Sequence, residues 1–402
     1  MLKNFWYALC LSREVAAKPI RVTALGNELV IYRTSKGEPR VMSDLCVHRG
    51  GALSDGWTKG DCIVCPYHGW EYQDDGACVR IPANLEGVAI PKKARVDAYP
   101  TREKYGFIWA FLGDLPENER PPMVEFPEFD DPKYKPLWGD YWWDVHYTRA
   151  VENGMDIAHA PFVHAGSFGN PDEPEVENYE VEETILGGDA TVNLNPPPAR
   201  GIYSKLRGGK ERPPVRTTGG FRMPNITRLQ VRLPFGDFVL YTCHLPVDDN
   251  KTRSIWLQLR SFFTKNFFDK DSMRRVIKIF NEDRRTVTEQ RPELLPYDLA
   301  AELHVRADTI QISYRKLRNK YLDMGWGIDT HRIQSEYANV KAVVIPSPAR
   351  REIPELAKAW VMKEVPVRNT KHGKDRNGGS GLNTAPTNGL SEIDAINATE
   401  EA

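Results

Sequence analysis

Hydrophobic residues recur in short runs along the first part of the 402-residue chain, and polar, turn-forming residues separate these runs. The runs at 28–34, 39–45 and 105–113 are rich in β-branched and aromatic side chains, which favour β-strands. Segments rich in Gly, Pro and Asp stand between them and favour turns. The pattern predicts a small all-β domain over residues 1–115, followed by a stiff, proline-rich linker over 116–132.

The pattern changes after this linker. Residues 228–247 and 254–264 look like paired strands of one sheet, whereas 272–290 and 304–322 have the helical period of apolar positions. Residues 133–365 are therefore expected to form a second domain that mixes strands with helices, which makes the fold class α+β. The remaining residues, 366–402, are poor in apolar side chains and are expected to form a disordered polar tail.

Composition and charge narrow the classes of function. Hydrophobic residues make up 41% of the chain and charged residues 27%, which are values typical of globular proteins. The formal net charge of −1 argues against binding of nucleic acid or of an acidic membrane. No run of about 18 apolar residues is present, so no membrane span is predicted. Six cysteines and no recognisable signal peptide lead us to expect a reducing, cytoplasmic location.

Four candidate metal ligands stand in two short motifs, Cys46-x-His48 and Cys65-x-x-His68. Two thiolates and two imidazoles presented in pairs can hold a [2Fe–2S] cluster, with the cysteines on one iron and the histidines on the other. This ligand set raises the reduction potential well above that of an all-cysteine cluster. The pattern therefore predicts an electron relay that feeds an oxidising centre.

Two simpler interpretations of these motifs compete. Cys2His2 is also a zinc ligand set, although zinc sites usually pair the two cysteines in one half and the two histidines in the other. Cys62-x-x-Cys65 has the spacing of a redox or zinc motif, but this interpretation leaves both histidines unexplained. Cys62 and Cys78 lie near the two motifs and are expected to be ordinary buried residues.

A second group of candidate ligands lies in residues 150–169, which contain Asn153, Asp156, His159 and His164. Two imidazoles and one carboxylate on one side of an iron(II) ion leave the other side open for O₂ and substrate. His159 and His164 are five residues apart, or about 140° around a regular helix, so they would not converge on one ion in a straight helix. Pro161 lies between them, and a kink or break there would allow convergence.

The carboxylate ligand can be local or distant. Asp156 is the local candidate, and Asp283 is the distant one because it shares the apolar face of a predicted helix with Val276 and Phe280. A carboxylate on an apolar face is costly unless it is paired or bound to metal. Glu282 is expected to point away from this face. The competing interpretation of Asp283 is a buried aspartate bonded to backbone or to an arginine.

Together, the two groups of motifs resemble the terminal oxygenase (α) subunit of Rieske non-haem iron oxygenases. The word N-x2-D-x2-H-x4-H, here Asn153, Asp156, His159 and His164, carries the mononuclear iron site of that family. The resemblance implies that the two histidines bind iron and that Asp283 completes the ligand set. The implied fold is a Rieske β-domain followed by a helix-grip domain, in which an antiparallel sheet wraps around helices.

The resemblance also implies an assembly. In this family Asp156 would bind no metal and would bridge His159 to a cluster histidine, His68, of a neighbouring subunit. Because the two metal sites of one chain are too far apart for fast electron transfer, a ring of subunits is implied, usually a homotrimer. The opening segment, residues 4–15, is more similar to the homotrimeric demethylase and monooxygenase branch than to the two-subunit dioxygenases.

The expected activity is that of a terminal oxygenase with one [2Fe–2S] cluster and one mononuclear Fe(II) per chain. It would use O₂ and electrons to hydroxylate or oxidatively demethylate a small aromatic substrate. No G-x-G-x-x-G segment follows a predicted strand, so a separate ferredoxin or flavin reductase is expected to supply the electrons.

Three alternatives stay open. A cis-dihydroxylating ring dioxygenase is the alternative within the enzyme class. A Rieske electron-transfer protein without oxygenase chemistry, or a zinc-stabilised binding module, are the alternatives from other classes. The dense lysine and arginine residues of 200–232 are candidates for orienting a carboxylated substrate or for docking an acidic ferredoxin, with solvated loops and strand faces as the simpler interpretation.

Overall fold

A computed structural model describes residues 1–198 and 213–370 of the chain. The predicted polar tail beyond residue 370 and the basic residues of 199–212 lie outside these ranges. The chain forms two compact units, one from Met1–Val124 together with the segment that begins at Lys320, and one from Glu125–Asn319. The second unit ends before the boundary expected for the catalytic domain at residue 365, and the expected domain boundaries stay a prediction.

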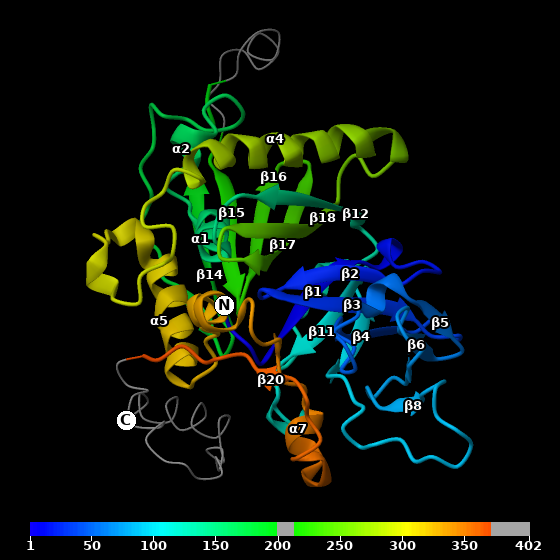
Figure 1. The fold of residues 1–402 in the computed structure, drawn as a ribbon. Helices are drawn as coiled ribbons and strands as arrows, with labels where there is room; N and C mark the ends of the chain where they lie inside the picture. The colour runs from blue at the N-terminus through cyan, green and yellow to red at the C-terminus, as the bar shows by residue number, and fades with distance from the viewer. Residues whose placement is uncertain (199–212, 371–402) are drawn as a thin grey trace. The chain divides into compact units, whose positions relative to one another are not determined.

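Three small antiparallel sheets form the N-terminal part of the first unit (Figure 1). The first sheet has the order β1 (Phe5–Leu11), β11 (Phe107–Leu112) and β10 (Thr101–Lys104). The second has the order β2 (Ile20–Ala24), β3 (Asn27–Arg33), β4 (Pro39–Ser43) and β9 (Ala98–Tyr99). The third has the order β5 (Trp57–Lys59), β6 (Cys62–Val64), β7 (Glu71–Tyr72) and β8 (Cys78–Arg80). The expected all-β character of this region is confirmed.

The later segment of the first unit contains α6 (Thr330–Arg332), β19 (Val343–Val344), α7 (Ala349–Glu352) and β20 (Lys363–Glu364). A buried ion pair joins this segment to the small sheets, because Arg350 Nη2 lies 2.8 Å from Asp97 Oδ2. Tyr99 Oη also donates a hydrogen bond of 2.6 Å to the Ile345 carbonyl. Breaking a buried pair leaves an uncompensated charge, so these contacts fix the segment firmly.

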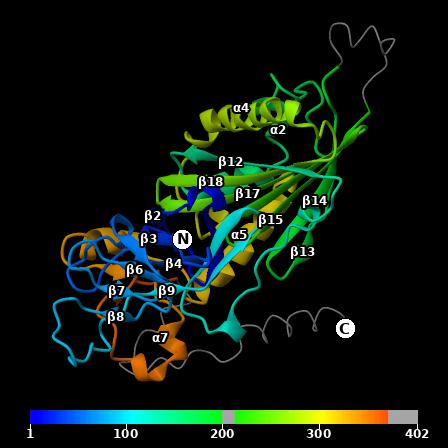
Figure 2. The ribbon, with the colours of Figure 1, turned by 90° about the vertical axis from the view of Figure 1, so that its right-hand side faces the viewer.

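One large antiparallel sheet dominates the second unit (Figures 1 and 2). In the part of the chain that the structure describes, its strand order is β12 (Lys135–Trp143), β18 (Lys251–Arg260), β17 (Gly236–Asp248), β16 (Ile226–Leu233), β15 (Val215–Arg222), β14 (Gly187–Leu194) and β13 (Glu182–Thr184). Because side chains of a strand alternate between its faces, every second residue of the central strands faces the same side. The paired strands expected over 228–264 are confirmed as β16, β17 and β18.

Helices of the second unit pack against this sheet. They are α1 (Tyr147–Met155), α2 (Ala160–Val163), α4 (Asp269–Val287) and α5 (Thr309–Asp323), whose last residues enter the first unit. The apolar face of α4, with Val276 and Phe280, packs on Trp143 and Trp256 of the sheet. Helices α4 and α5 lie within about five residues of the ranges expected for them, 272–290 and 304–322, and the α+β class is confirmed. Among the described residues, no helix has both the length and the apolar character needed to cross a membrane.

A buried network of ion pairs fixes α1, the helix that precedes the histidine motif. Arg315 of α5 makes two contacts with Glu152 of α1, at 2.5 and 2.8 Å. Glu302 bridges Arg315 and Arg149, at 2.6 and 2.7 Å. Because alternating charges surround each other here, the cost of burying them is offset within the network. The end of α1, and with it Asn153, is thereby held in place.

Candidate metal centres and active site

The two cysteine–histidine motifs form loops with the same hydrogen-bond pattern. Gly50 N–H donates to the Cys46 carbonyl at 2.8 Å, and Gly69 N–H donates to the Cys65 carbonyl at 2.9 Å. Both glycines have a φ of 70°, a conformation that residues with a Cβ rarely adopt. Each loop therefore closes on itself through a glycine, and the two loops meet where His48 stacks on Trp70, with 4.6 Å between ring centroids.

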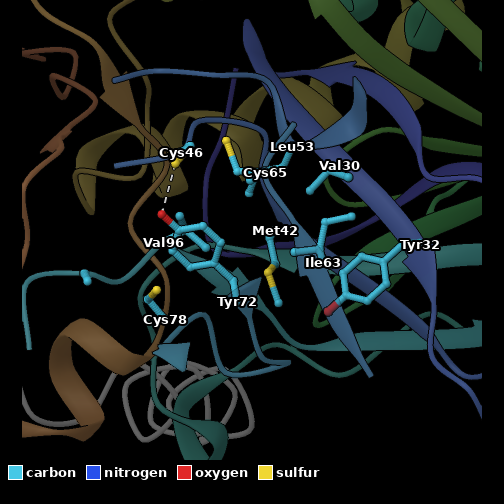
Figure 3. Packing of buried hydrophobic residues seen from close by; sticks show 11 residues of the cluster. Val30, Tyr32, Met42, Cys46, Leu53, Ile63, Cys65, Tyr72, Cys78 and Val96 are labelled. Carbon is cyan, nitrogen blue, oxygen red and sulfur yellow. Dashed lines mark hydrogen bonds between the residues drawn. The ribbon is translucent and has the colours of Figure 1, made fainter. Parts of the chain in front are cut away.

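The loops place thiols inside and imidazoles outside. Cys46 and Cys65 are 2% and 1% exposed and belong to the core cluster in Figure 3, where Cys46 Sγ lies 3.0 Å from Tyr72 Oη. The rings of His48 and His68 are 4.4 Å apart, and His68 is exposed. Burial is the largest influence on the Cys46 thiol and raises its pKa. A pair of buried thiols beside a pair of outward imidazoles suits a cluster with cysteines on one iron and histidines on the other.

The same geometry disfavours the zinc interpretation. A single ion draws its ligand atoms close together. Within residues 1–198 and 213–370, three such atoms within 4.8 Å of one another occur at His159, His164 and Asp283 but not at the four residues of the two loops. Cys62 and Cys78 lie outside the loops, on β6 and β8. The Cys62-x-x-Cys65 interpretation therefore gains no support.

The histidine motif is divided between two helices. Helix α1 ends at Met155, and Asp156 adopts an extended conformation that stops it. The short helix α2 then lies between His159 and His164, with Pro161 in its first turn, where the missing N–H has no intrahelical partner to lose. The helix therefore breaks at Asp156, before both histidines, and α2 ends just before His164, so the kink expected at Pro161 is wrong.

His159, His164 and Asp283 converge on one point. The Nε2 atoms of the two histidines are 3.2 Å apart, and Asp283 Oδ1 lies 3.3 Å from the first and 3.2 Å from the second. Asp283 is buried on the apolar face of α4, as expected, and it faces the imidazoles and no arginine. Two nitrogen atoms and one carboxylate oxygen in this arrangement are a typical ligand set for non-haem iron(II).

Two further carboxylates contact the outer nitrogens of these imidazoles. His164 Nδ1 lies 2.9 Å from Glu282 Oε2, and Ser167 Oγ donates to Glu282 Oε1 at 2.6 Å. Asp156 Oδ2 lies 3.6 Å from His159 Nδ1. A hydrogen bond such as that of Glu282 fixes the orientation and tautomer of a metal-binding imidazole, whereas His159 Nδ1 has no hydrogen-bond partner among the described residues. Glu282 lies off the apolar face of α4, as expected, and it reaches the imidazole because α2 lies beside that side of the helix.

The protonation behaviour of the group agrees with its geometry. Burial alone would lower the pKa of His159, but the carboxylates of Asp156 and Asp283 outweigh it and raise the pKa to about 9. Burial alone would raise the pKa of Asp283, but hydrogen bonds to the two imidazoles lower it. The site therefore favours positive charge at the imidazoles, which a metal cation can supply in place of a proton.

These residues line a cavity of about 920 Å³ between α4 and the sheet, and Asn153 and Asp156 are also part of its wall. His244 and Thr227 line it too, with His244 Nε2 3.0 Å from Thr227 Oγ1. Burial lowers the pKa of His244 to about 3, so its imidazole is neutral. Sequence reasoning missed these two residues because no local motif marks a strand position that faces a cavity.

Two parts of the chain match known protein families. Residues 5–100 match the Rieske [2Fe–2S] domain, and residues 143–324 match the vanillate O-demethylase oxygenase C-terminal domain. The chain therefore belongs to the Rieske oxygenases, a family of oxidoreductases, and it carries an iron–sulfur cluster domain followed by an oxygenase domain. The resemblance found in the sequence is confirmed.

The matches to relatives cover from about half of the chain to about four fifths of it. Methylxanthine N1-demethylase from Pseudomonas putida is 29% identical over 330 residues, which cover 78% of this chain and 88% of the relative. The vanillate O-demethylase oxygenase subunit from a Pseudomonas species is 31% identical over 49% of this chain and 55% of its own length. The solved structure of NdmA from Pseudomonas putida CBB5 with caffeine has a TM-score of 0.66 and 27% identity, and the match covers 79% of this chain and 90% of that one. These relatives agree with a terminal oxygenase that hydroxylates or demethylates a small molecule.

Proposed function

We propose that this oxygenase holds a [2Fe–2S] cluster at Cys46, His48, Cys65 and His68, and a mononuclear Fe(II) at His159, His164 and Asp283. The cluster supplies electrons one at a time when bound, and ferrous iron supplies the site at which O₂ is activated. The observation that carries the second assignment is the convergence of Nε2, Nε2 and Oδ1 within 4.8 Å at a cavity wall. Three ligands from one side leave the side of the cavity open for O₂ and substrate.

The protein's own residues would orient this site and keep water from it. Glu282 accepts a hydrogen bond from His164 Nδ1 and so directs Nε2 towards Asp283. Apolar side chains of β16 and β17, such as Leu229 and Leu240, would exclude water from the substrate. Asn153 lines the cavity beside Asp156 and is placed to contact substrate or O₂.

The electrons would come from outside the chain. Relatives are oxygenase components of multicomponent systems, and we propose that a separate ferredoxin or flavin reductase reduces the cluster here as well. We further propose that the working form is a homotrimer, in which Asp156 bridges His159 to a cluster histidine, His68, of a neighbouring subunit. A carboxylate between two imidazoles can accept a hydrogen bond from each, which would join the two centres by a short path.

The proposed reaction is hydroxylation of a C–H bond, including that of an N-methyl or O-methyl group. Relatives are named for demethylation of methylxanthines and of vanillate. Hydroxylation of such a methyl group gives a hemiaminal or hemiacetal, which loses formaldehyde. Labelled O₂ separates this reaction from cis-dihydroxylation, because one labelled oxygen per product indicates monooxygenation and two indicate dioxygenation.

Iron and acid-labile sulfide per chain, measured on protein purified without oxygen, test the proposal. About three irons and two sulfides are expected for a cluster plus a mononuclear site. A His159→Ala variant should keep both sulfides and lose about one iron. Two irons in the parent protein after ferrous reconstitution would leave only an electron carrier, and zinc without sulfide would overturn both metal assignments.

A further inference from the structure

The cavity extends well beyond the three candidate iron ligands. Along α4 it is lined from Asp271 through Arg275 and Ile279 to Asp283. These positions follow one another at intervals of about one turn, from the exposed Asp271 and Arg275 to the buried Asp283, and at about 1.5 Å per residue they span about 18 Å. The candidate iron ligands lie at one end of this length, so most of the cavity extends away from them as a channel.

The sheet side of the channel is built in cross-strand layers. Val231 of β16 pairs with Phe238 of β17, and the next inward-facing pair is Leu229 with Leu240. Gly219 of β15 pairs with Leu229 and also lines the cavity, and a Cβ at this position would lie 3.4 Å from the Met155 carbonyl oxygen. These layers are apolar, so they favour an apolar ligand over water.

The polar groups at the inner end already have partners. Thr227 Oγ1 and His244 Nε2 are 3.0 Å apart, and His244 Nδ1 lies 2.8 Å from Ser254 Oγ. A substrate therefore need not supply hydrogen bonds to them. Thr227, His244 and Ser254 therefore leave no unpaired group at this end for a polar ligand to satisfy.

Most charged residues that line the cavity, among those described, are exposed at its rim. The exceptions are the candidate iron ligands, Asp156 and one arginine. Arg260 is that arginine. It is paired with Asp269, but its buried Nη1 has no hydrogen-bond partner among the described residues. At the rim, Asp271 and Arg275 pair with each other at 2.8 Å. These formal charges thus balance within pairs, while Arg260 Nη1 is left to donate one hydrogen bond to a polar atom of a ligand.

The far end of the channel opens between phenylalanine rings. Phe235 stands 4.9 Å from Phe262, and Phe263 stands 4.9 Å from Phe268, measured between ring centroids. Phe235 is 59% exposed and Phe263 is 57% exposed, although both line the cavity. An exposed cluster of aromatic side chains is a common sign of a site that binds apolar molecules.

We propose that the substrate is an extended, uncharged, apolar molecule of about 18 Å, such as a fused-ring or alkyl-aryl compound. The carbon that is oxidised lies beside His159, and the far end reaches the phenylalanine rings. This inference rests on the proposed function only in the choice of the reacting end. The shape and polarity of the substrate follow from the channel itself.

Binding of a homologous series tests the inference. The probes are 4-alkyl methoxybenzenes with alkyl chains of increasing length, each with a counterpart that ends in a carboxylate. Dissociation constants are measured by calorimetry on the full, metal-loaded chain without reductant. Binding should tighten roughly threefold per methylene until the alkyl chain reaches the mouth. No gain with length would overturn the inference, and tighter binding of the acids would overturn it in favour of an anion site at Arg260.

Substitutions on the two faces of β16 test whether the dependence of affinity on probe length arises in the channel. Val231→Trp should remove the gain for long probes and leave the shortest probe within about twofold of the parent, because the new ring blocks the channel beyond the reacting end. Arg232→Trp adds the same side chain on the other face of β16 and should change neither. Leu240→Phe repeats the test from β17 if Val231→Trp does not fold. Unchanged affinity for long probes in both channel variants would refute the channel as the substrate site.

Binding and turnover separate the two proposals. A length-dependent affinity without formaldehyde or another oxygenated product, in the presence of a surrogate reductase, would reject the oxygenase function and keep the channel. Turnover of short probes without a dependence on length would keep the oxygenase function and reject the extended substrate.

Discussion

The two candidate metal centres differ in how the chain assembles them. All four residues of the cluster site fall between Cys46 and His68, on two loops that close through their own glycines. The candidate iron site joins His159 and His164 to Asp283, with β13 to β18 between them in the sequence. The first centre depends on local spacing, whereas the second depends on the fold of a whole domain. Each centre should therefore survive the loss of the other.

Loss of the cluster is the largest change that this comparison predicts. In Cys46→Ala the inner iron loses one of its two thiolates, so colour, sulfide and turnover should all fall below detection. Visible absorption and sulfide content measure the cluster, and the iron that remains should amount to about one per chain. Cys62→Ser is the matched control and should keep the cluster. A colourless Cys62→Ser protein would instead revive the Cys62-x-x-Cys65 interpretation.

Loss of the distant carboxylate should spare the cluster. Asp283→Ala removes the one ligand that α4 supplies, so about one iron per chain should be lost while the visible spectrum is unchanged. Turnover should fall roughly a thousandfold, since a bound metal ion contributes several kcal/mol to such reactions. Full iron content in this variant would show that Asp156 or another group is the carboxylate ligand.

A substitution of Asp156 should interrupt electron transfer between the two metal centres while both metals stay bound. Asp156→Ala should leave cluster and mononuclear iron bound, because Asp156 lies 3.6 Å from the outer nitrogen of His159 and outside the ligand set. Turnover should nevertheless fall about a hundredfold or more, as is found when outer contacts of metal ligands are lost. Reduction of the cluster followed by stopped-flow absorption would show whether electrons still leave it. Unchanged turnover would contradict the bridging role.

The smallest effect is expected where a contact only orients a ligand. Glu282→Gln keeps the size of the side chain and removes the charge that holds His164 Nδ1, so affinity for ferrous iron should fall by about tenfold. Competition with a chelator measures that affinity without any need for turnover. Glu289→Gln, beyond the end of the same helix, is the control. Equal affinities in the two variants would rule out a positioning role for Glu282.

The sequence predicts the local centre better than the distant one. Cys46 and His48 can be predicted as ligands from the sequence, because a loop that binds a cluster needs its cysteine and histidine at a fixed spacing. Asp283 was readable as a carboxylate on an apolar helix face, although the face alone could not name its partner. Glu282 lies off that face, as predicted, but its contact with His164 could not be predicted, since periodicity does not show that α2 covers the adjacent side of α4.

The cavity was not predictable for a related reason. Whether Leu229 and Leu240 share a layer depends on the register between two strands, and one sequence does not fix it. The pair of Glu152 and Arg315, which holds α1, likewise joins two segments that are far apart in the sequence. Properties that arise from pairing between distant segments therefore had to come from the structure.

Cys46 is buried and His68 is exposed, so a bound cluster would face the core with its thiolate side and the surface with its imidazole side. Electron transfer slows steeply with distance, and the core around the thiols insulates one side of a bound cluster. The imidazole edges are the shortest route in and out, so donor and acceptor would have to use the same small window in turn. If both partners use this one surface, reduction of the cluster and electron transfer to the iron would exclude each other. Dissociation of the oxidised reductase could then limit the rate of the whole cycle.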